Sequence, residues 1–175
     1  MRRTGLSQRF FSGRPSFYIC MTLLLSLCAC AGGLSPASRA LVTFHEPFTV
    51  LARDPERHLG AVVLVGGRVI ETIPSSSRSE ILVLQIPLGG RDVPADPDRS
   101  EGRFIIRSTG FLDPEVYPPG TLLSVVGRVT GGEYREIGGY PYLYPVLDPI
   151  EIKTWQAPKD DFPNVFFSFG IGTTF

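Results

Sequence analysis

Gly60-Ala-Val-Val-Leu-Val-Gly-Gly-Arg-Val-Ile70 is the stretch of sequence that decides the fold, because a similar stretch recurs 60 residues later as Gly120-Thr-Leu-Leu-Ser-Val-Val-Gly-Arg-Val-Thr130. Each copy is an apolar run that ends in a glycine, Gly67 or Gly127, followed by Arg-Val. A glycine inside a strand marks a sharp bend or the close approach of another backbone. Small OB barrels of five strands need such bends in strands one and four, where the two copies fall.

Outside these two copies, apolar runs at residues 81–86, 104–106 and 142–152 are separated by glycines and prolines. Short runs of this kind predict an all-β domain, which we place at residues 44–156. We expect an OB-like barrel of five strands, with a β-sandwich as the alternative. Residues 113–118 predict one short helical turn between strands three and four, in which Asp113 is the N-cap and Pro114 the first helical residue.

The N-terminus has the layout of a secretory signal, with four arginines and no acid in residues 1–29 and a short apolar stretch at residues 17–27. It ends in Leu27-Cys28-Ala29-Cys30, which resembles the lipobox of bacterial lipoproteins. The resemblance implies cleavage after Ala29 and lipidation of Cys30. Cys28 is a poorer acceptor, because Leu27 would then stand where a small residue is wanted. An ordinary signal peptide is the alternative.

Cys30 is then the only cysteine left in the mature chain, and lipidation explains its presence in an oxidising compartment. Several acyl chains on one residue anchor a protein firmly. Ala31 follows, and the absence of Asp there favours the outer membrane by similarity to known sorting patterns. We therefore expect a lipid-anchored protein of the outer membrane that faces the periplasm, with residues 30–43 as a flexible tether.

The charge of the mature chain argues against two classes of partner. Removing the four arginines of residues 1–29 leaves 13 basic against 17 acidic residues, a net charge of −4. A nucleic-acid-binding domain would need a basic face. The same balance gives no reason to expect adhesion to anionic lipid.

The chain shows no catalytic motif, and we predict no cofactor. His45 and His58, the only histidines, have no Cys, His or carboxylate at ligand spacing, so no metal site is predicted. Asp113 is the one candidate acid, and its position before a proline favours a structural cap instead.

Two groups of residues are candidates for ligand binding. Tyr140, Tyr142 and Tyr144 alternate along a strand and so share a face, which OB barrels use for oligosaccharides and oligonucleotides. Arg68 and Arg128 occupy equivalent places in the two similar stretches and are candidates for binding an anion together. The structural alternatives are rings that cover the barrel and arginines that protect strand edges.

The C-terminal tail, residues 157–175, ends in an alternating aromatic pattern that resembles the last strand of an outer-membrane β-barrel. One strand cannot span a membrane alone. It can pack on its own domain, add to the sheet of a partner protein, or lie at the membrane interface. The candidate partner-binding residues on one face of this strand are Phe167, Phe169, Ile171 and Phe175.

Several blocks in this order resemble the Slp family of starvation-inducible outer-membrane lipoproteins: Gly67-Arg68-Val69-Ile70, Leu84-Gln85-Ile86-Pro87-Leu88, Gly102-Arg103-Phe104, Ser108-Thr109-Gly110-Phe111-Leu112-Asp113-Pro114-Glu115-Val116-Tyr117, Val126-Gly127-Arg128-Val129 and Ile152-Lys153-Thr154-Trp155. The resemblance implies an envelope protein linked to stationary phase or acid stress, and it supplies no molecular activity, because the family has no agreed catalytic residues. We therefore predict a non-enzymatic accessory lipoprotein that acts through protein interaction. The alternative is an OB-type module that binds glycans or small anions in the periplasm.

Overall fold

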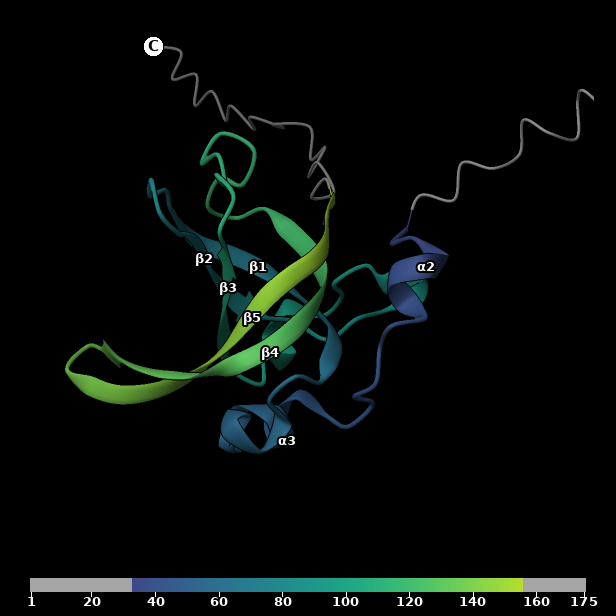
Figure 1. Ribbon diagram of the computed structural model, residues 1–175, viewed down its shortest axis with the longest axis horizontal. Coiled ribbons are helices and arrows are strands. Elements are labelled where there is room, and N and C mark those ends of the chain that lie inside the picture. Colours follow the sequence, from purple (N-terminus) through teal and green to yellow (C-terminus); the bar gives the residue numbers. More distant parts are fainter. Residues whose placement is uncertain (1–32, 156–175) are drawn as a thin grey trace, which may run out of the picture. The chain divides into compact units, whose positions relative to one another are not determined.

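The computed structural model describes residues 33–155, which form a closed five-stranded barrel with a few short helices (Figure 1). The helices are α2 (Pro36–Arg39), α3 (Phe48–Arg53), and the 3-10 turns η1 (Pro55–His58), η2 (Gly90–Asp92) and η3 (Pro97–Arg99). The strands are β1 (Val62–Ile73), β2 (Ser79–Gln85), β3 (Arg103–Ser108), β4 (Leu122–Ile137) and β5 (Tyr140–Trp155).

The strand order around the barrel is β1-β2-β3-β5-β4, and β4 pairs back onto β1. All neighbours are antiparallel except β3 and β5, which are parallel and pair only at Ile105–Val146 and Ile106–Leu147. This is a small Greek-key barrel of the OB type. The predicted barrel is therefore confirmed against the sandwich.

The two similar stretches are β1 and the first part of β4, and they lie side by side as antiparallel neighbours. β1 pairs with β4 over residues 62–68 and with β2 over residues 67–73. Gly67 therefore lies where the strand passes from one neighbour to the other. A Cβ atom on Gly67 would lie 2.3 Å from the carbonyl oxygen of Leu84, and one on Gly127 would lie 3.2 Å from that of Asp148. The close backbone approach predicted from both glycines is confirmed.

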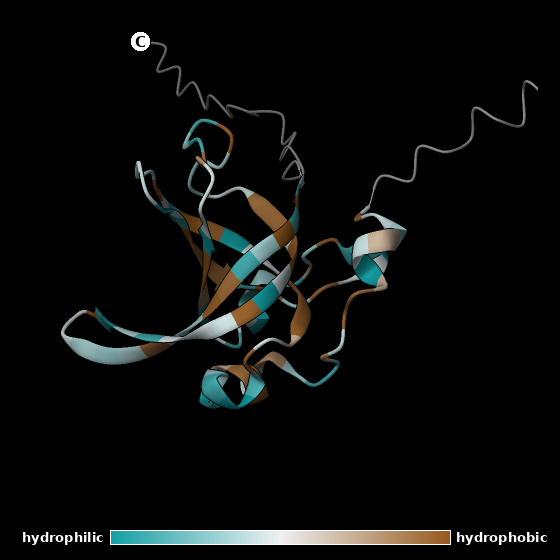
Figure 2. Ribbon diagram, viewed as in Figure 1, coloured by the Kyte–Doolittle hydropathy of each residue, from teal (hydrophilic) through white to brown (hydrophobic). Residues whose placement is uncertain are grey.

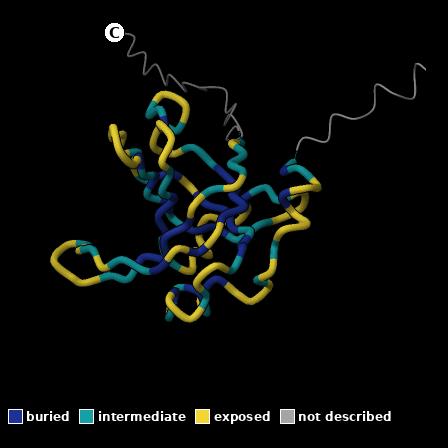
Figure 3. The backbone as a smooth tube through the Cα atoms, viewed as in Figure 1, coloured by how far each residue is buried: buried dark blue, intermediate teal, exposed yellow. Residues whose placement is uncertain are grey.

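The core fills the barrel with the inward side chains of every strand. Buried and hydrophobic residues accordingly gather where the strands form the barrel, whereas the end of the β4–β5 hairpin is exposed (Figures 2 and 3). Phe48 and Leu51 of α3 join this core and close one end of the barrel. Leu112 and Tyr117, from the connection between β3 and β4, pack against the same core. The sequence reasoning did not predict α3, although it covers an open end that any small barrel must fill.

One local prediction was confirmed and another was wrong. Residues 113–118 form the predicted single turn, which does not continue as a helix: the Asp113 carbonyl oxygen accepts the N–H groups of Val116 and Tyr117, each at 3.0 Å. Pro118 and Pro119 follow, and a proline disfavours helical geometry in the residue before it. The described part of the predicted flexible tether, from Gly33, packs on the barrel instead. Leu34 is buried there, and α2 begins directly after it.

Candidate functional site

The outer face of β2 and β3, where OB barrels bind their ligands, is covered in this protein by its own chain. β4 and β5 continue beyond the barrel as a long hairpin, which Figure 1 shows reaching away from the strands. Ile105 is 0% exposed although it points outward, because side chains of the hairpin pack against it. The cluster on this face comprises Leu82, Ile105, Ile137, Tyr142, Tyr144 and Val146.

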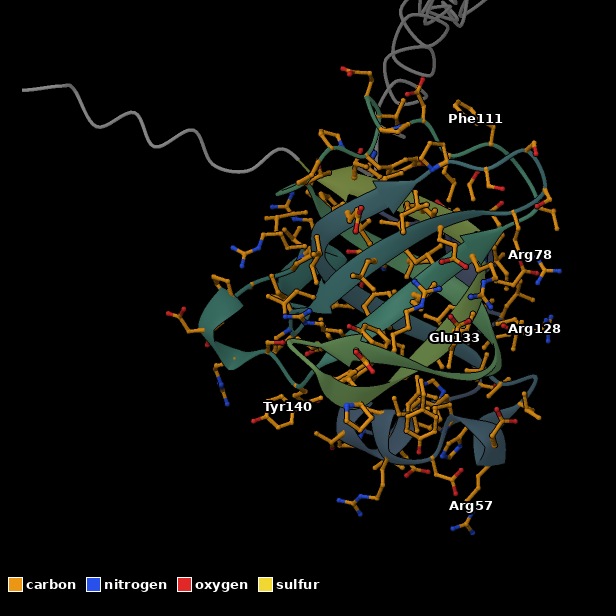
Figure 4. The ribbon with its side chains drawn as sticks, turned by 90° about the vertical axis from the view of Figure 1, so that its left-hand side faces the viewer. Arg57, Arg78, Phe111, Arg128, Glu133 and Tyr140 are labelled. Atoms are coloured by element: carbon orange, nitrogen blue, oxygen red, sulfur yellow. The ribbon has the colours of Figure 1, made fainter. Side chains whose placement is uncertain are left out.

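The three candidate tyrosines lie along the hairpin strand β5, and two of them, Tyr142 and Tyr144, belong to this packing. Tyr144 is 2% exposed and meets Tyr142 edge to face, with ring centroids 4.8 Å apart. The Tyr142 hydroxyl accepts the backbone N–H of Arg103 at 2.9 Å. Only Tyr140, which is 78% exposed and lies at the hairpin end (Figure 4), is available to a ligand.

Four charged side chains, which we call the charge ring, join the hairpin to the barrel. Glu80 of β2 accepts from Arg107 Nε of β3 and from Arg135 Nη2 of β4, each at 2.6 Å. Glu133 of β4 accepts from Arg135 Nε at 2.7 Å and also from Arg107. Positive and negative charges therefore alternate around a closed set of four ion pairs that connects three strands.

The environment of the charge ring shifts the pKa values of Arg107, Glu133 and Arg135. Burial alone would raise the pKa of the Glu133 carboxyl, but hydrogen bonds from Arg107 and Arg135 and the charges of both arginines outweigh burial and lower it. Burial likewise opposes the charged forms of the two arginines, and their carboxylate partners outweigh it and raise both pKa values. Arg107, Glu133 and Arg135 are consequently held in their charged forms at neutral pH.

Arg68 and Arg128 are not brought together. Because β1 and β4 are antiparallel, Arg68 pairs with Leu122 while Arg128 pairs with Val62. The two pairs are six positions apart along β1, which corresponds to about 20 Å along the strands. Both arginines are exposed, and Arg128 Nη1 donates to the carbonyl oxygen of Gly60 at 2.9 Å.

Two of the pockets that open on the described surface include His45 or Arg107 in their lining. One, of about 500 Å³, lies between the N-terminal segment and the connection after β2, and its lining includes Phe44, His45, Leu88 and Asp92. The other, of about 340 Å³, is lined by Arg78, Arg107, Thr109, Thr130 and Asp148.

Neither histidine belongs to a reactive group in the part of the chain that the structure describes. His58 packs edge-on against Phe44, with centroids 4.9 Å apart, and no metal-binding cluster occurs within residues 33–155. Asp113 is a structural residue, as expected, because its Oδ1 accepts the N–H of Glu115 at 2.9 Å. The same range contains no helix with the length and apolar composition needed to cross a membrane.

The exposed loop, which we define as residues 109–120, presents apolar side chains to solvent. Phe111 is 70% exposed and Val116 is 56% exposed, and Figure 4 shows Phe111 at the edge of the molecule. The loop is nevertheless fastened to the barrel, because Leu112 is buried and Thr72 Oγ1 donates to the Tyr117 carbonyl oxygen at 2.7 Å. The loop therefore holds Phe111 in a defined position.

The remaining predicted sites, Cys30 and the C-terminal face of Phe167, Phe169, Ile171 and Phe175, lie outside the described residues. The sequence did not predict the charge ring, nor that the hairpin covers the outer face of β2 and β3, which we call the ligand face. Glu133 and Arg135 are two residues apart in the sequence and therefore lie on the same face of β4. Their partners on β2 and β3 follow only from the fold of the hairpin.

Comparison with known proteins shows which family this sequence matches. The sequence model of the Outer membrane lipoprotein Slp family matches residues 27–169, starting at the first residue of the predicted lipobox. The chain is 30% identical to lipoprotein YeaY of Escherichia coli K12 over 105 residues, which cover 60% of this chain and 54% of that protein.

The chain is also 24% identical to Outer membrane protein Slp of the same strain over 111 residues, which cover 63% of this chain and 58% of that protein. It thus spans slightly more than half the length of these curated relatives. No solved structure matches. Since the family match extends over most of its residues, the chain belongs to the Slp family of outer membrane lipoproteins.

Proposed function

We propose that this protein is anchored in the outer membrane by lipid on Cys30, faces the periplasm, and acts without catalysis by binding another envelope protein. The observation that carries the binding role is Phe111, which is 70% exposed on a loop that Leu112 and Tyr117 fasten to the barrel. A large apolar side chain held in water by a fixed loop is suited to filling a pocket of a partner. This role would be an accessory one, connected with envelope stress.

A protein partner fits this barrel better than a glycan. An OB module for glycans would bind on the outer face of β2 and β3, and there the hairpin buries Ile105 and Tyr144. A glycan on this face would have to displace the hairpin and break the charge ring. The exposed loop requires no rearrangement, since Phe111 and Val116 are already in solvent.

The C-terminal strand is proposed as a second contact. Its residues Phe167, Phe169, Ile171 and Phe175 alternate with smaller or polar residues, which gives the strand one apolar face. Such a strand can extend the edge of a partner's sheet through backbone hydrogen bonds.

Fractionation of cells tests the anchor. Cys30→Ala should move the protein from the outer-membrane fraction to the soluble periplasm, because the residue that accepts the lipid is lost. Cys28→Ala is the matched control, since it changes a neighbouring cysteine that the signal peptide carries away. Membrane attachment of Cys30→Ala that withstands high salt would contradict the proposal.

Photo-crosslinking in living cells tests the partner. A photoreactive phenylalanine analogue would replace Phe111, with Tyr134 as a matched control position. Both are aromatic and equally open to solvent, at 70% and 72% exposed. We expect a defined protein adduct from Phe111 and none from Tyr134, and a probe at Phe169 reports on the C-terminal strand. Glycan adducts from a probe at Tyr142, with no protein adduct from Phe111 or Phe169, would instead support the ligand-binding module.

A further inference from the structure

The N-terminal segment of the barrel is fastened almost immediately after the proposed lipidation site. Leu34 is 3% exposed and packs with Val62 and Val126 on the outside of β1 and β4. The backbone N–H of Ser35 donates to the two Glu151 carboxylate oxygens at 3.0 and 3.2 Å, and the Ser35 hydroxyl donates to the same carboxylate at 2.7 Å. The chain therefore leaves the barrel from a defined point.

The distance from this point to the lipid is short. Only Ala31, Gly32 and Gly33 separate Cys30 from Leu34, which makes four peptide steps. A fully extended chain spans at most about 3.6 Å per residue, so the reach is at most about 14 Å. The polar headgroup layer of one leaflet already takes up about 5–8 Å of that distance. A barrel attached at Leu34 consequently cannot move far from the membrane surface.

The segment nearest the anchor has a surface suited to lipid headgroups. Apart from Arg39, its exposed side chains are small or apolar and include Pro36, Ala37, Ala40 and Leu41, of which Leu41 is 50% exposed. Arg39 is the only charged residue between Gly33 and His45, and it is paired with Asp92. Residues 33–45 themselves contain no acidic side chain that would repel anionic headgroups.

From the short reach and this composition, we propose that α2 with Ala40 and Leu41 rests directly on the lipid surface of the outer membrane. We call this surface the membrane face. The inference depends on the proposed lipidation of Cys30 and adds an orientation to it. In Figure 1, α2 and the tip of the β4–β5 hairpin lie on opposite sides of the described domain. The hairpin tip, with Tyr140, should therefore point away from the bilayer.

Quenching by nitroxide-labelled lipid tests this orientation on the lipidated protein reconstituted into phosphatidylethanolamine–phosphatidylglycerol vesicles. The mature chain has no cysteine besides Cys30, whose thiol the lipid occupies, so a single fluorophore can be attached after Leu41→Cys or, as the distant control, Tyr140→Cys. We expect several-fold stronger quenching at position 41 than at position 140. Both positions are exposed, and Ala37→Cys serves as a second probe of the membrane face if Leu41→Cys folds poorly.

Flotation of the same vesicles separates the two proposals. Failure of the wild-type protein to float with lipid would refute the anchor itself. Flotation with equal quenching at positions 41 and 140 would leave the anchor standing and overturn the orientation. Inserting about ten Gly and Ser residues after Cys30 should keep flotation and reduce quenching at position 41 toward that at position 140, because the longer tether frees the barrel.

Discussion

Glu133→Gln should loosen the hairpin that covers the ligand face. The Glu133 carboxylate accepts from Arg107 and, at 2.7 Å, from Arg135 Nε. Glutamine is nearly the same size but carries no charge, so both ion pairs are lost while Glu80 still contacts both arginines. Partly exposed ion pairs contribute about 0.2–1 kcal/mol each. The loss should be about 1 kcal/mol, which makes opening of the hairpin about fivefold more frequent.

Hydrogen exchange of the non-lipidated mature chain measures this opening directly. Amides of residues 133–144 should exchange about fivefold faster in Glu133→Gln, while core amides of β1 should exchange at nearly the wild-type rate. Glu136→Gln is the matched control, because it removes the same charge from an exposed residue of the same strand. Glu136 forms no ion pair within the described residues. Equal exchange rates in the two variants would show that the charge ring does not hold the hairpin.

Three further outcomes follow from the same contacts. The folded-state pKa of Glu133 is lowered, so the ionised carboxylate stabilises the folded protein fully above the unfolded pKa of about 4.3, and this stabilisation disappears as pH falls through the folded pKa. The urea midpoints of wild type and Glu133→Gln should therefore converge below about pH 4. Gly67→Ala would place a Cβ 2.3 Å from a β2 backbone oxygen and should cost about 3 kcal/mol, whereas Gly90→Ala meets no atom within 4 Å and should stay within about 0.5 kcal/mol by urea denaturation. Glu151→Gln should speed hydrogen exchange of residues 34–41 several-fold, because the charge-assisted bonds to Ser35 are weakened.

The barrel was predictable because its signals are local. Each strand is an apolar run bounded by glycine or proline, and the two similar stretches each end in a glycine that a side chain would obstruct. Those glycines identify strands one and four, and with them the barrel. The family resemblance follows largely from the same stretches, since five of its six blocks lie within a strand or overlap a strand end, and the sixth begins at the last residue of β3.

The covered ligand face was not predictable, because it depends on where the hairpin folds. The alternation of Tyr140, Tyr142 and Tyr144 identifies one face of β5 but not what that face touches. Whether the tyrosines meet a ligand or Ile105 depends on strand register, and the register depends on contacts between residues far apart in the sequence. The N-terminal segment had a local signal that was overlooked: Ser35-Pro36 is an N-cap followed by proline at the first helical position.

A barrel that has filled its own ligand face can recognise other molecules only through the surfaces that stay exposed, so its orientation on the membrane becomes important. Binding requires the loss of rotational freedom, and a barrel already held on the bilayer by a short tether has lost part of it beforehand. Phe111 would then meet a membrane-bound partner at a restricted set of angles. Inserting about ten flexible residues after Cys30 should therefore weaken crosslinking from Phe111 in cells, although Phe111 and the anchor are both unchanged. Crosslinking of undiminished strength would mean that the partner accepts the barrel in any orientation, and that the short tether serves another purpose.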